Sequence, residues 1–456
     1  MNEHTNMKLE RAVTLDAMVR VFRPEPLDEA SLEEFYYSNT MLSRTGDPTD
    51  SPLEDLFEDC IAPLGSNAHL LSGHSGCGKS TEFARLRQRF EEMGYPAIII
   101  NTQRDMNLNL ADCWDIMLFI AYGLCEVAEQ NKIKLPGTTL RAMFDYLRQD
   151  MEETKTTESS SSVGIEASAA ASATFGIGAV LKLFASIKSN LQLGAQTRLI
   201  IKEKFERRAS EWMLYVNEIS DIIADASNGK QPIIIFEDLD KIQPYERAFD
   251  IFSYDTLAKM PFPIIYTFPI AATYDARCAS IDRLYKIHIF PMIKVSNEDK
   301  SENNEGIDTI RKIVGLRADL GLFEDVSRRS ALEIMIKQTG GVLRQLFECI
   351  TTASRRARRR GAERIEMEDA RRALSDMASM LSRRISMDEY PMLINIIRDA
   401  KYREHIENRE SLLKLMHGLI VLEYKNGDRW QDVHPLIADF LTKQGVVDEA
   451  SDTANR

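Results

Sequence analysis

The feature that most constrains the fold of this sequence is one stretch of eight residues, Gly73-His74-Ser75-Gly76-Cys77-Gly78-Lys79-Ser80. It fits the pattern G-x-x-x-x-G-K-[ST] without a mismatch. A short apolar run, 68–72, precedes it, and a segment with the apolar spacing of a helix, 80–93, follows it. The order strand, glycine loop, helix is the context in which this pattern holds phosphate. The sequence therefore predicts a phosphate-binding loop in an α/β domain.

The residue types of this loop suit a nucleoside triphosphate with Mg²⁺. Glycines let the backbone curl so that its N–H groups point at an anion, at the positive end of the following helix. The Lys79 ammonium would reach the β- and γ-phosphates, and the Ser80 hydroxyl would bind Mg²⁺. We expect the side chains of His74 and Cys77 to be passive. We therefore expect ATP and Mg²⁺ as ligands, and a binding set of Gly73, Ser75, Gly76, Cys77, Gly78, Lys79, Ser80 and Thr81.

Carboxylates follow a second apolar run. The run 232–236 is short and β-branched, as in a buried strand, and Glu237, Asp238 and Asp240 come directly after it. Acids gathered at one strand end repel each other unless a cation lies among them. This is a Walker B pattern: Glu237 would hold Mg²⁺, Asp238 would orient the attacking water, and Asp240 would be a supporting charge. The alternative is that these acids cap the next helix.

Together with Thr339-Gly340-Gly341-Val342-Leu343-Arg344 and a separate strand ending in Thr267, these motifs resemble AAA+ and related STAND-type signal-transduction ATPases, especially the replication-initiator-like clade. The resemblance covers roughly residues 40–385. It implies an α/β P-loop NTPase fold: a parallel sheet flanked by helices, followed by an α-helical lid and a winged-helix domain. It also implies that the strand 264–268 lies between the two Walker strands.

The same resemblance suggests roles for polar residues outside the loop. Thr267 looks like the residue that senses the γ-phosphate, although it would also suit an ordinary strand end. Arg344 looks like the lid arginine that reaches the phosphates, with a surface arginine as the alternative. Arg277 and Arg283 are candidates for a finger that completes a neighbour's site, although a helix can also end in arginine. Asn101 could restrain the catalytic acid until a partner binds.

One departure from the family pattern concerns the two acids. The family usually has Asp first and often Glu second, whereas this chain has Glu237 and then Asp238. The reversed lengths could make turnover slow or dependent on a partner. The alternative register, with Asp238 on the metal and Asp240 on the water, stays open.

The chain divides into five expected parts. They are an N-terminal segment (1–45), the ATPase core (46–300), a helical lid (301–386), a winged helix (387–445) and a disordered tail (446–456). The winged helix is expected because an Asn-Gly turn at 426–427 joins two strand-like runs after two helical ones. Within the core, a Ser/Ala/Gly-rich insertion spans about 154–194. We interpret it as flexible; the alternative is an element that touches a partner or a membrane, because apolar residues recur in 180–187.

Two regions could contact nucleic acid. Arg355-Arg356-Ala357-Arg358-Arg359-Arg360 is strongly basic, but it would end a lid helix, where cations are favourable, and acids follow it. The expected hairpin carries Lys425, Arg429 and His434 but also acids, so it is not a strongly cationic wing. DNA or RNA binding and a solvated, partly paired surface are both open for these regions.

Composition bears on whether the protein coats nucleic acid, forms disulfides or spans a membrane. The formal net charge of −13 argues against a chain that coats nucleic acid over its whole surface. Six cysteines without metal-ligand spacing indicate reduced thiols, and no apolar run approaches the roughly 20 residues that span a bilayer. We therefore expect a cytoplasmic protein without integral membrane association.

Taken together, the sequence predicts an ATP-binding and ATP-hydrolysing molecular switch that controls a protein partner, an attached domain or a homo-oligomer. Proteins that look like this often act in bacterial regulation or in defence against phage. The alternative is a DNA-binding ATPase that loads or remodels nucleic acid. DNA-stimulated turnover and steeply salt-dependent binding would distinguish that alternative.

Overall fold

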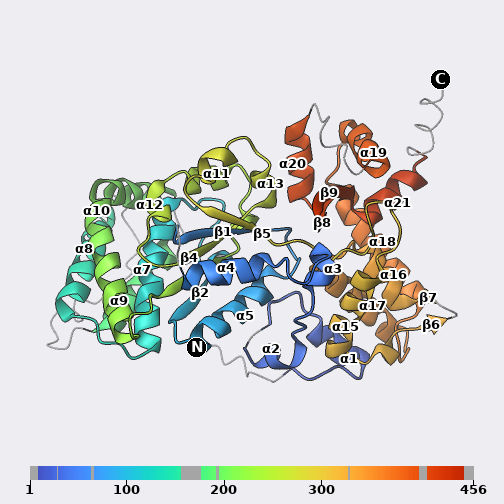
Figure 1. Cartoon of the computed structure of the whole chain (residues 1–456), viewed down its shortest axis with the longest axis horizontal. Helices are drawn as coiled ribbons and strands as arrows, with labels where there is room; N and C mark the ends of the chain where they lie inside the picture. Colours follow the sequence, from blue (N-terminus) through green and yellow to red (C-terminus); the bar gives the residue numbers. More distant parts are fainter. Residues whose placement is uncertain are drawn as a thin grey trace.

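The computed structural model describes residues 9–27, 29–62, 66–155, 176–191, 195–326, 329–399 and 408–445 (Figure 1). The predicted tail, 446–456, lies outside these residues. A parallel sheet occupies the centre of the molecule. A group of long helices lies at one end, and a second helical region with a hairpin lies at the other (Figure 1).

The central sheet has five strands in the order β2-β3-β4-β1-β5, all parallel. Their bounds are β1 Ala68–Ser72, β2 Ala97–Asn101, β3 Ile233–Glu237, β4 Ile264–Phe268 and β5 Lys286–Ile289. The predicted insertion of 264–268 between the two Walker strands is confirmed, because β4 pairs with β1 on one side and β3 on the other. In β1, β3 and β4 every residue is buried, as expected for strands covered on both faces.

Helices cover both faces of the sheet. Because successive side chains of a strand point to opposite faces, the apolar side chains of each strand are divided between two cores. On one face, Leu71 and Ile235 belong to a core with α4 (Pro52–Ile61) and α5 (Lys79–Glu92). On the other, Leu70 and Ile234 join a larger core with α7 (Cys113–Gln130). A parallel sheet is stable when helices cover both of its faces. Because all five strands run in the same direction, their carboxyl ends lie at the same edge of the sheet.

The described part of the predicted Ser/Ala/Gly-rich insertion is a packed helix, which corrects the expectation of flexibility for residues 177–191 alone. Residues 156–175 and 192–194 lie outside the described part, but α9 (Ile177–Leu191) packs against α7, α8 (Gly137–Lys155) and α10 (Ala195–Ala226). Its apolar side chains recur at i, i+3, i+4 and i+7 and are buried in that bundle: Val180, Leu183, Phe184 and Ile187. None of the described helices has the length and apolar character needed to cross a membrane.

The second helical region follows the sheet. It contains α15 (Asn304–Arg317), α16 (Ala331–Gln338), α17 (Leu343–Arg359), α18 (Met367–Ser382) and a short ladder of β6 (Asp325–Val326) with β7 (Arg329–Ser330). The N-terminal segment does not stand apart from it, because α1 (Leu15–Val21) packs on α17 and α2 (Glu29–Phe35) contacts α15. The second helical region, which corresponds to the expected lid, is therefore packed against the N-terminal helices α1 and α2.

The last described part contains the predicted hairpin. Strands β8 (Val421–Asn426) and β9 (Asp428–Val433) pair antiparallel, and Asn426 faces Asp428 across Gly427. Gly427 has φ of 73°, which a side chain would disfavour. The helices around the hairpin are α19 (Tyr390–Arg398), α20 (Arg409–His417) and α21 (Pro435–Lys443).

Short helices complete the fold: α3 (Met41–Thr45), α6 (Thr102–Asp105), α11 (Arg247–Phe252), α12 (Asp255–Ala258), α13 (Ile270–Thr273) and α14 (Cys278–Ile281). Between β3 and β4 the chain thus forms two short helices, α11 and α12. All six cysteines are buried and form no disulfide, in line with the prediction of reduced thiols.

Candidate nucleotide-binding site

The glycine loop joins β1 to α5, as the sequence predicts. Gly76 and Gly78 have φ of 83° and 110°, in the left-handed region that favours glycine. A Cβ on Gly76 would lie 2.8 Å from the Cβ of Arg344. The loop therefore needs glycine here both for its backbone conformation and for the close approach of α17.

Lys79 lies at the centre of the site, and its ammonium donates to three oxygens. They are the carbonyls of Gly73 (2.7 Å) and His74 (3.0 Å) and a carboxylate oxygen of Asp240 (2.8 Å). Burial alone would lower the pKa of Lys79, but the charge and hydrogen bond of Asp240, together with Cys77, raise the pKa. The reverse holds for Asp240, whose pKa is lowered because Lys79 outweighs the effect of burial. Lys79 is therefore a charged, internally paired cation.

The predicted acids meet at the carboxyl end of β3. Asn101 ends the neighbouring strand, and its amide donates to Glu237 (3.4 Å) and Asp238 (3.1 Å). Asp238 also pairs with Lys241 at 2.6 Å, and its φ of 70° is uncommon for a residue other than glycine. Burial, together with the charge of Asp238, raises the pKa of Glu237 although Ser80 lowers it.

The residues present fit a magnesium ion. Glu237 Oε1 is buried, and within the described part of the chain it has no hydrogen-bond partner. The Ser80 side chain lies against the same carboxylate. A hydroxyl and a buried carboxylate are oxygen ligands of the kind Mg²⁺ prefers.

Thr267 and Arg344 both line the same cavity as the loop. The Thr267 hydroxyl accepts from the backbone N–H of Asp240 and donates to the carbonyl of Phe236, each at 3.3 Å, so it ties β4 to β3. Arg344 is the second residue of α17, where its backbone N–H donates to the Gly76 carbonyl and its guanidinium to Ser75 Oγ, both at 3.2 Å. The structure thus brings together the loop, the acids, Thr267 and Arg344.

The N-terminal segment forms a wall of this cavity, which the sequence did not predict. Leu27, Phe35, Tyr36 and Tyr37 line it opposite the loop. The Tyr36 hydroxyl donates to Glu82 at 2.9 Å, and burial together with Glu82 raises the Tyr36 pKa. An apolar and aromatic wall beside a phosphate loop suits a nucleoside base.

Arg44 is a second residue that the sequence did not identify. It is fully buried, and its guanidinium donates to the carbonyls of Cys77 (3.0 Å) and Pro291 (2.6 Å) while lying 4.1 Å from the Phe290 ring centroid. It therefore holds the glycine loop against the segment after β5. No sequence pattern marks it, because its partners are backbone carbonyls of distant segments.

His74 overturns the expectation of a passive side chain. It is 1% exposed, and its Nε2 accepts the backbone N–H of Glu423 in β8 at 2.8 Å. Burial, with Lys79 nearby, lowers the pKa of His74 to about 3, so the ring is neutral and can accept. The phosphate-binding loop thus directly contacts the C-terminal hairpin.

The core has the fold of a P-loop nucleoside triphosphatase. This follows from the parallel sheet in which β4 separates β1 and β3, and from the glycine loop between β1 and α5.

Arg277 and Arg283 lie outside the cavity of this P-loop core, and Arg277 pairs with Asp275 at 2.7 Å. Ion pairs also engage Arg356, Arg358 and Arg360 of the basic run, whereas Arg355 and Arg359 are exposed.

Comparisons with solved structures give matches of low identity and low TM-score. A Walker-type ATPase of Pyrococcus abyssi has 14% identity and a TM-score of 0.44, over 92% of this chain and 99% of that one. Cdc6p of Pyrobaculum aerophilum has 11% identity and a TM-score of 0.36, over 94% and 98%. The ORC1 protein of Aeropyrum pernix, solved in complex with DNA, has 12% and 0.34, over 98% and 97%. No family model and no curated protein sequence matches the P-loop chain. Because these similarities are low, the assignment of the fold rests on sheet order and loop geometry.

Proposed function

We propose that this chain binds Mg·ATP in the cavity between the glycine loop, α17 and the N-terminal segment, and that it hydrolyses ATP to switch the position of its C-terminal hairpin. The observation that carries the proposal is the hydrogen bond from Glu423 in β8 to His74 inside the phosphate-binding loop. A ligand that reshapes the loop must act on this bond.

Each residue of the site has a chemical task in this proposal. Loop amides and Lys79 would neutralise the phosphates, and Arg344 would approach them from the lid. Ser80 and Glu237 would hold Mg²⁺, which supplies positive charge to the developing phosphoryl oxygens. Asp238 would accept the proton of the attacking water.

The partner of Lys79 supports Glu237 on the metal and Asp238 on the water, over the alternative of Asp238 on the metal and Asp240 on the water. Asp240 already binds the loop lysine at 2.8 Å, whereas Glu237 lies against Ser80. Asp240 therefore suits the role of a place-holder for phosphate, because bound phosphate would replace its carboxylate on Lys79. This exchange gives the site a structural difference between its empty and filled forms.

Asn101 suits a restraining role. Its amide and the Lys241 ammonium together occupy both oxygens of Asp238. Both donors would compete with the attacking water for the Asp238 oxygens. Turnover would then require that Asn101 or Lys241 release Asp238, which fits a slow or partner-stimulated ATPase.

The cations of the hairpin support an internal role for this unit. Lys425 pairs with Asp50 at 2.5 Å, and Arg429 pairs with Glu423 at 2.8 Å. The Tyr424 hydroxyl donates to the Gly340 carbonyl at 2.7 Å, just before α17. The hairpin is thus docked on the core and lid; Lys425 takes part in that docking, whereas Arg429 is paired within the hairpin.

The experiment that tests the proposal combines nucleotide binding with hydrogen exchange. Calorimetry with Mg²⁺ should give ATP binding that Lys79→Ala weakens about 10- to 100-fold, since it removes charge-assisted hydrogen bonds. Lys414→Ala, which removes an exposed lysine of α20, is the matched control and should bind normally. A non-hydrolysable ATP analogue should change amide exchange in β8 of the native protein. Absence of ATP binding would refute the site; binding with unchanged β8 exchange would refute the switch alone.

A second function, binding of duplex DNA, is favoured by the exposed Arg355 and Arg359 at the end of α17. In this alternative the two arginines would contact phosphates. Binding of a DNA duplex should weaken with salt, and the double variant Arg355→Ala/Arg359→Ala should reduce the logarithmic salt slope by about 2. Arg372→Ala removes an exposed arginine of α18 and is the control. A salt slope equal to that of the native protein would exclude this surface.

A further inference from the structure

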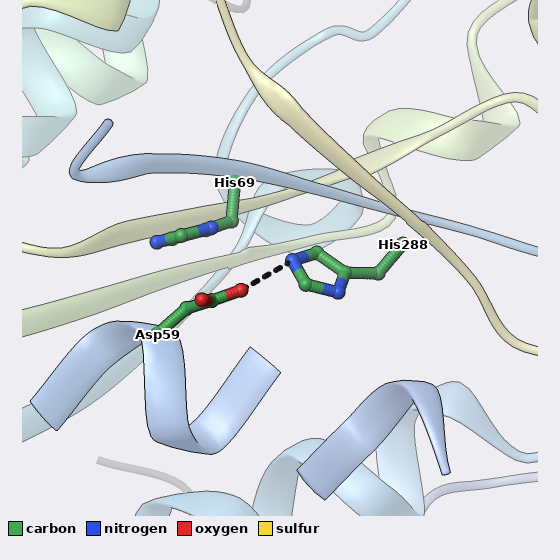
Figure 2. A group of neighbouring side chains, drawn as sticks. All are labelled: Asp59, His69 and His288. Atoms are coloured by element: carbon green, nitrogen blue, oxygen red, sulfur yellow. Dashed lines mark ion pairs between the residues drawn. The ribbon is translucent and has the colours of Figure 1, made fainter. Parts of the chain in front are cut away.

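A cluster of two histidines and an aspartate lies on the opposite side of β1 from the large core, away from the acids of the nucleotide site. His69 comes from β1, His288 from the adjacent β5, and Asp59 from α4, which covers both strands. In Figure 2 the three side chains converge between the helix and the two strands. Each offers one ligand atom, and these atoms all lie within 4.8 Å of one another.

The strand register explains why the histidines meet. Leu71 is paired with His288, and His69 with Lys286, so His69 and His288 are diagonal neighbours on one face of the sheet. Their ring centroids are 5.5 Å apart. The surrounding face is an apolar core that includes Leu56, so the three polar groups are an exception within it.

Within the described residues, both ring nitrogens of His69 and Nε2 of His288 lack the hydrogen bonds that buried imidazoles normally make. His69 is 1% exposed, and within the described residues neither of its ring nitrogens has a hydrogen-bond partner. His288 is 5% exposed, and its Nε2 faces the Asp59 carboxylate at 3.5 Å, the contact dashed in Figure 2. Leaving a buried polar group unsatisfied is unfavourable, so these nitrogens are candidates for an external partner.

Electrostatics keep both rings in the form that can ligate a metal. Burial, and then the neighbouring His288, lowers the pKa of His69 to about 4. Burial likewise lowers the pKa of His288, although Asp59 opposes the shift. Neutral imidazole has a free lone pair, which a protonated ring lacks.

We propose that Asp59, His69 and His288 form a binding site for a divalent transition-metal ion of the zinc type. Two imidazoles and one carboxylate match zinc, whereas Mg²⁺ and Ca²⁺ prefer oxygen ligands only. Ligands about 2.1 Å from a tetrahedral ion are about 3.4 Å apart. The pair His288–Asp59 already has this separation, so the site closes when His69 turns toward them by about 1 Å.

Lys286 is the competitor for this ion. Its ammonium lies 2.6 Å from Asp59 Oδ2, but its side chain is 55% exposed. It can therefore turn into water, and the loss of an ion pair with a half-exposed cation costs little. The bound ion would clamp α4 to β1 and β5, with His69 four residues before Gly73 in the chain. This site does not depend on the proposed nucleotide chemistry.

The test uses the full chain, stripped with a chelator and then titrated with Zn²⁺ by calorimetry, with metal content measured by elemental analysis. One zinc per chain is expected, with excess Mg²⁺ failing to compete. His69→Gln and His288→Gln should weaken binding more than about 100-fold, beyond the effect of losing an outer-shell group. His417→Gln removes a partly buried histidine of α20 and should bind as the native protein does.

A further variant keeps the proposal testable even if the histidine variants fail to fold. Lys286→Gln removes only the competing cation at a half-exposed position, so zinc should bind several-fold more tightly. Co²⁺ bound to the native protein should give the intense visible absorption of a four-coordinate site. Failure of the native protein to bind zinc at micromolar concentration would overturn the proposal. So would unchanged affinity in folded His69→Gln, or a six-coordinate Co²⁺ spectrum.

Discussion

Replacing His74 by alanine tests the contact between the phosphate-binding loop and the C-terminal hairpin. The variant removes the acceptor of the Glu423 N–H, a bond of 2.8 Å between two buried residues that are 349 positions apart. A buried donor left without an acceptor costs about 1–3 kcal/mol. If that cost is borne by the docked state of the hairpin, undocking becomes about 5- to 150-fold more frequent.

The assay is amide hydrogen exchange followed by mass spectrometry on peptides that contain β8. In the range where exchange reports the opening equilibrium, the Glu423 amide should exchange about 5- to 150-fold faster in His74→Ala. Peptides from β2, on the far edge of the sheet, provide an internal reference and should not change. His74→Gln retains a side-chain acceptor and should lie between the alanine variant and the native protein.

The reasoning would be refuted by a folded His74→Ala protein with native exchange in β8. The hairpin would then be held by its other contacts, such as Tyr424 to Gly340 and Lys425 to Asp50. In that case the loop would have no direct influence on the hairpin, and the proposed coupling would lose its path.

Other predictions concern the nucleotide site and pH. Asp240→Asn should lower the free energy of unfolding by about 3 kcal/mol, because Lys79 loses a buried charge partner. ATP should nevertheless raise the melting temperature of this variant by more than it raises that of the native protein. Weaker ATP binding by the variant would instead support Asp240 as a ligand of metal or water. Asp238→Asn should bind ATP without turning it over, and native turnover would exclude it as the base. Arg344→Ala should weaken ATP binding about tenfold, or about 1.4 kcal/mol, and unchanged binding and turnover in an ATPase assay would exclude its role. The pKa of His74, about 3 when folded against 6.5 unfolded, means that the unfolded state binds more protons between these values. Stability should therefore fall as pH drops below 6.5, by about 2 kcal/mol at pH 5 from this group, and urea unfolding of His74→Gln should show a smaller loss.

Local sequence was enough to predict the strands and the loop of the core. The run 233–236 is β-branched and apolar, and the glycine pattern 73–80 is contiguous, so both depend on backbone preferences within a few residues. The hairpin could be predicted for the same reason, since Asn426-Gly427 is a turn by itself. The position of 264–268 between the Walker strands came from family resemblance, and the observed pairing agrees with it.

Average composition was a poor guide to residues 177–191, the described helix of the predicted Ser/Ala/Gly-rich insertion. The described helix 177–191 carries an apolar stripe at helical spacing, and that periodicity indicated burial better than the average composition did. The elements that pack against such an apolar stripe are decided by the tertiary structure and cannot be deduced from the local sequence. Here its partners are helices from both earlier and later parts of the chain.

The sequence by itself determined the phosphate loop, the alternating strands and the order of the acids, because each is a local pattern with a local physical cause. Only the tertiary structure decided the contacts of Arg44 with Cys77, of His74 with Glu423, and of His69 with His288. Each of these joins groups that are far apart in sequence, through backbone atoms or ring nitrogens that no residue pattern encodes. Folding brings them together because burial of the apolar sheet faces carries the segments that bear these groups into the same interior.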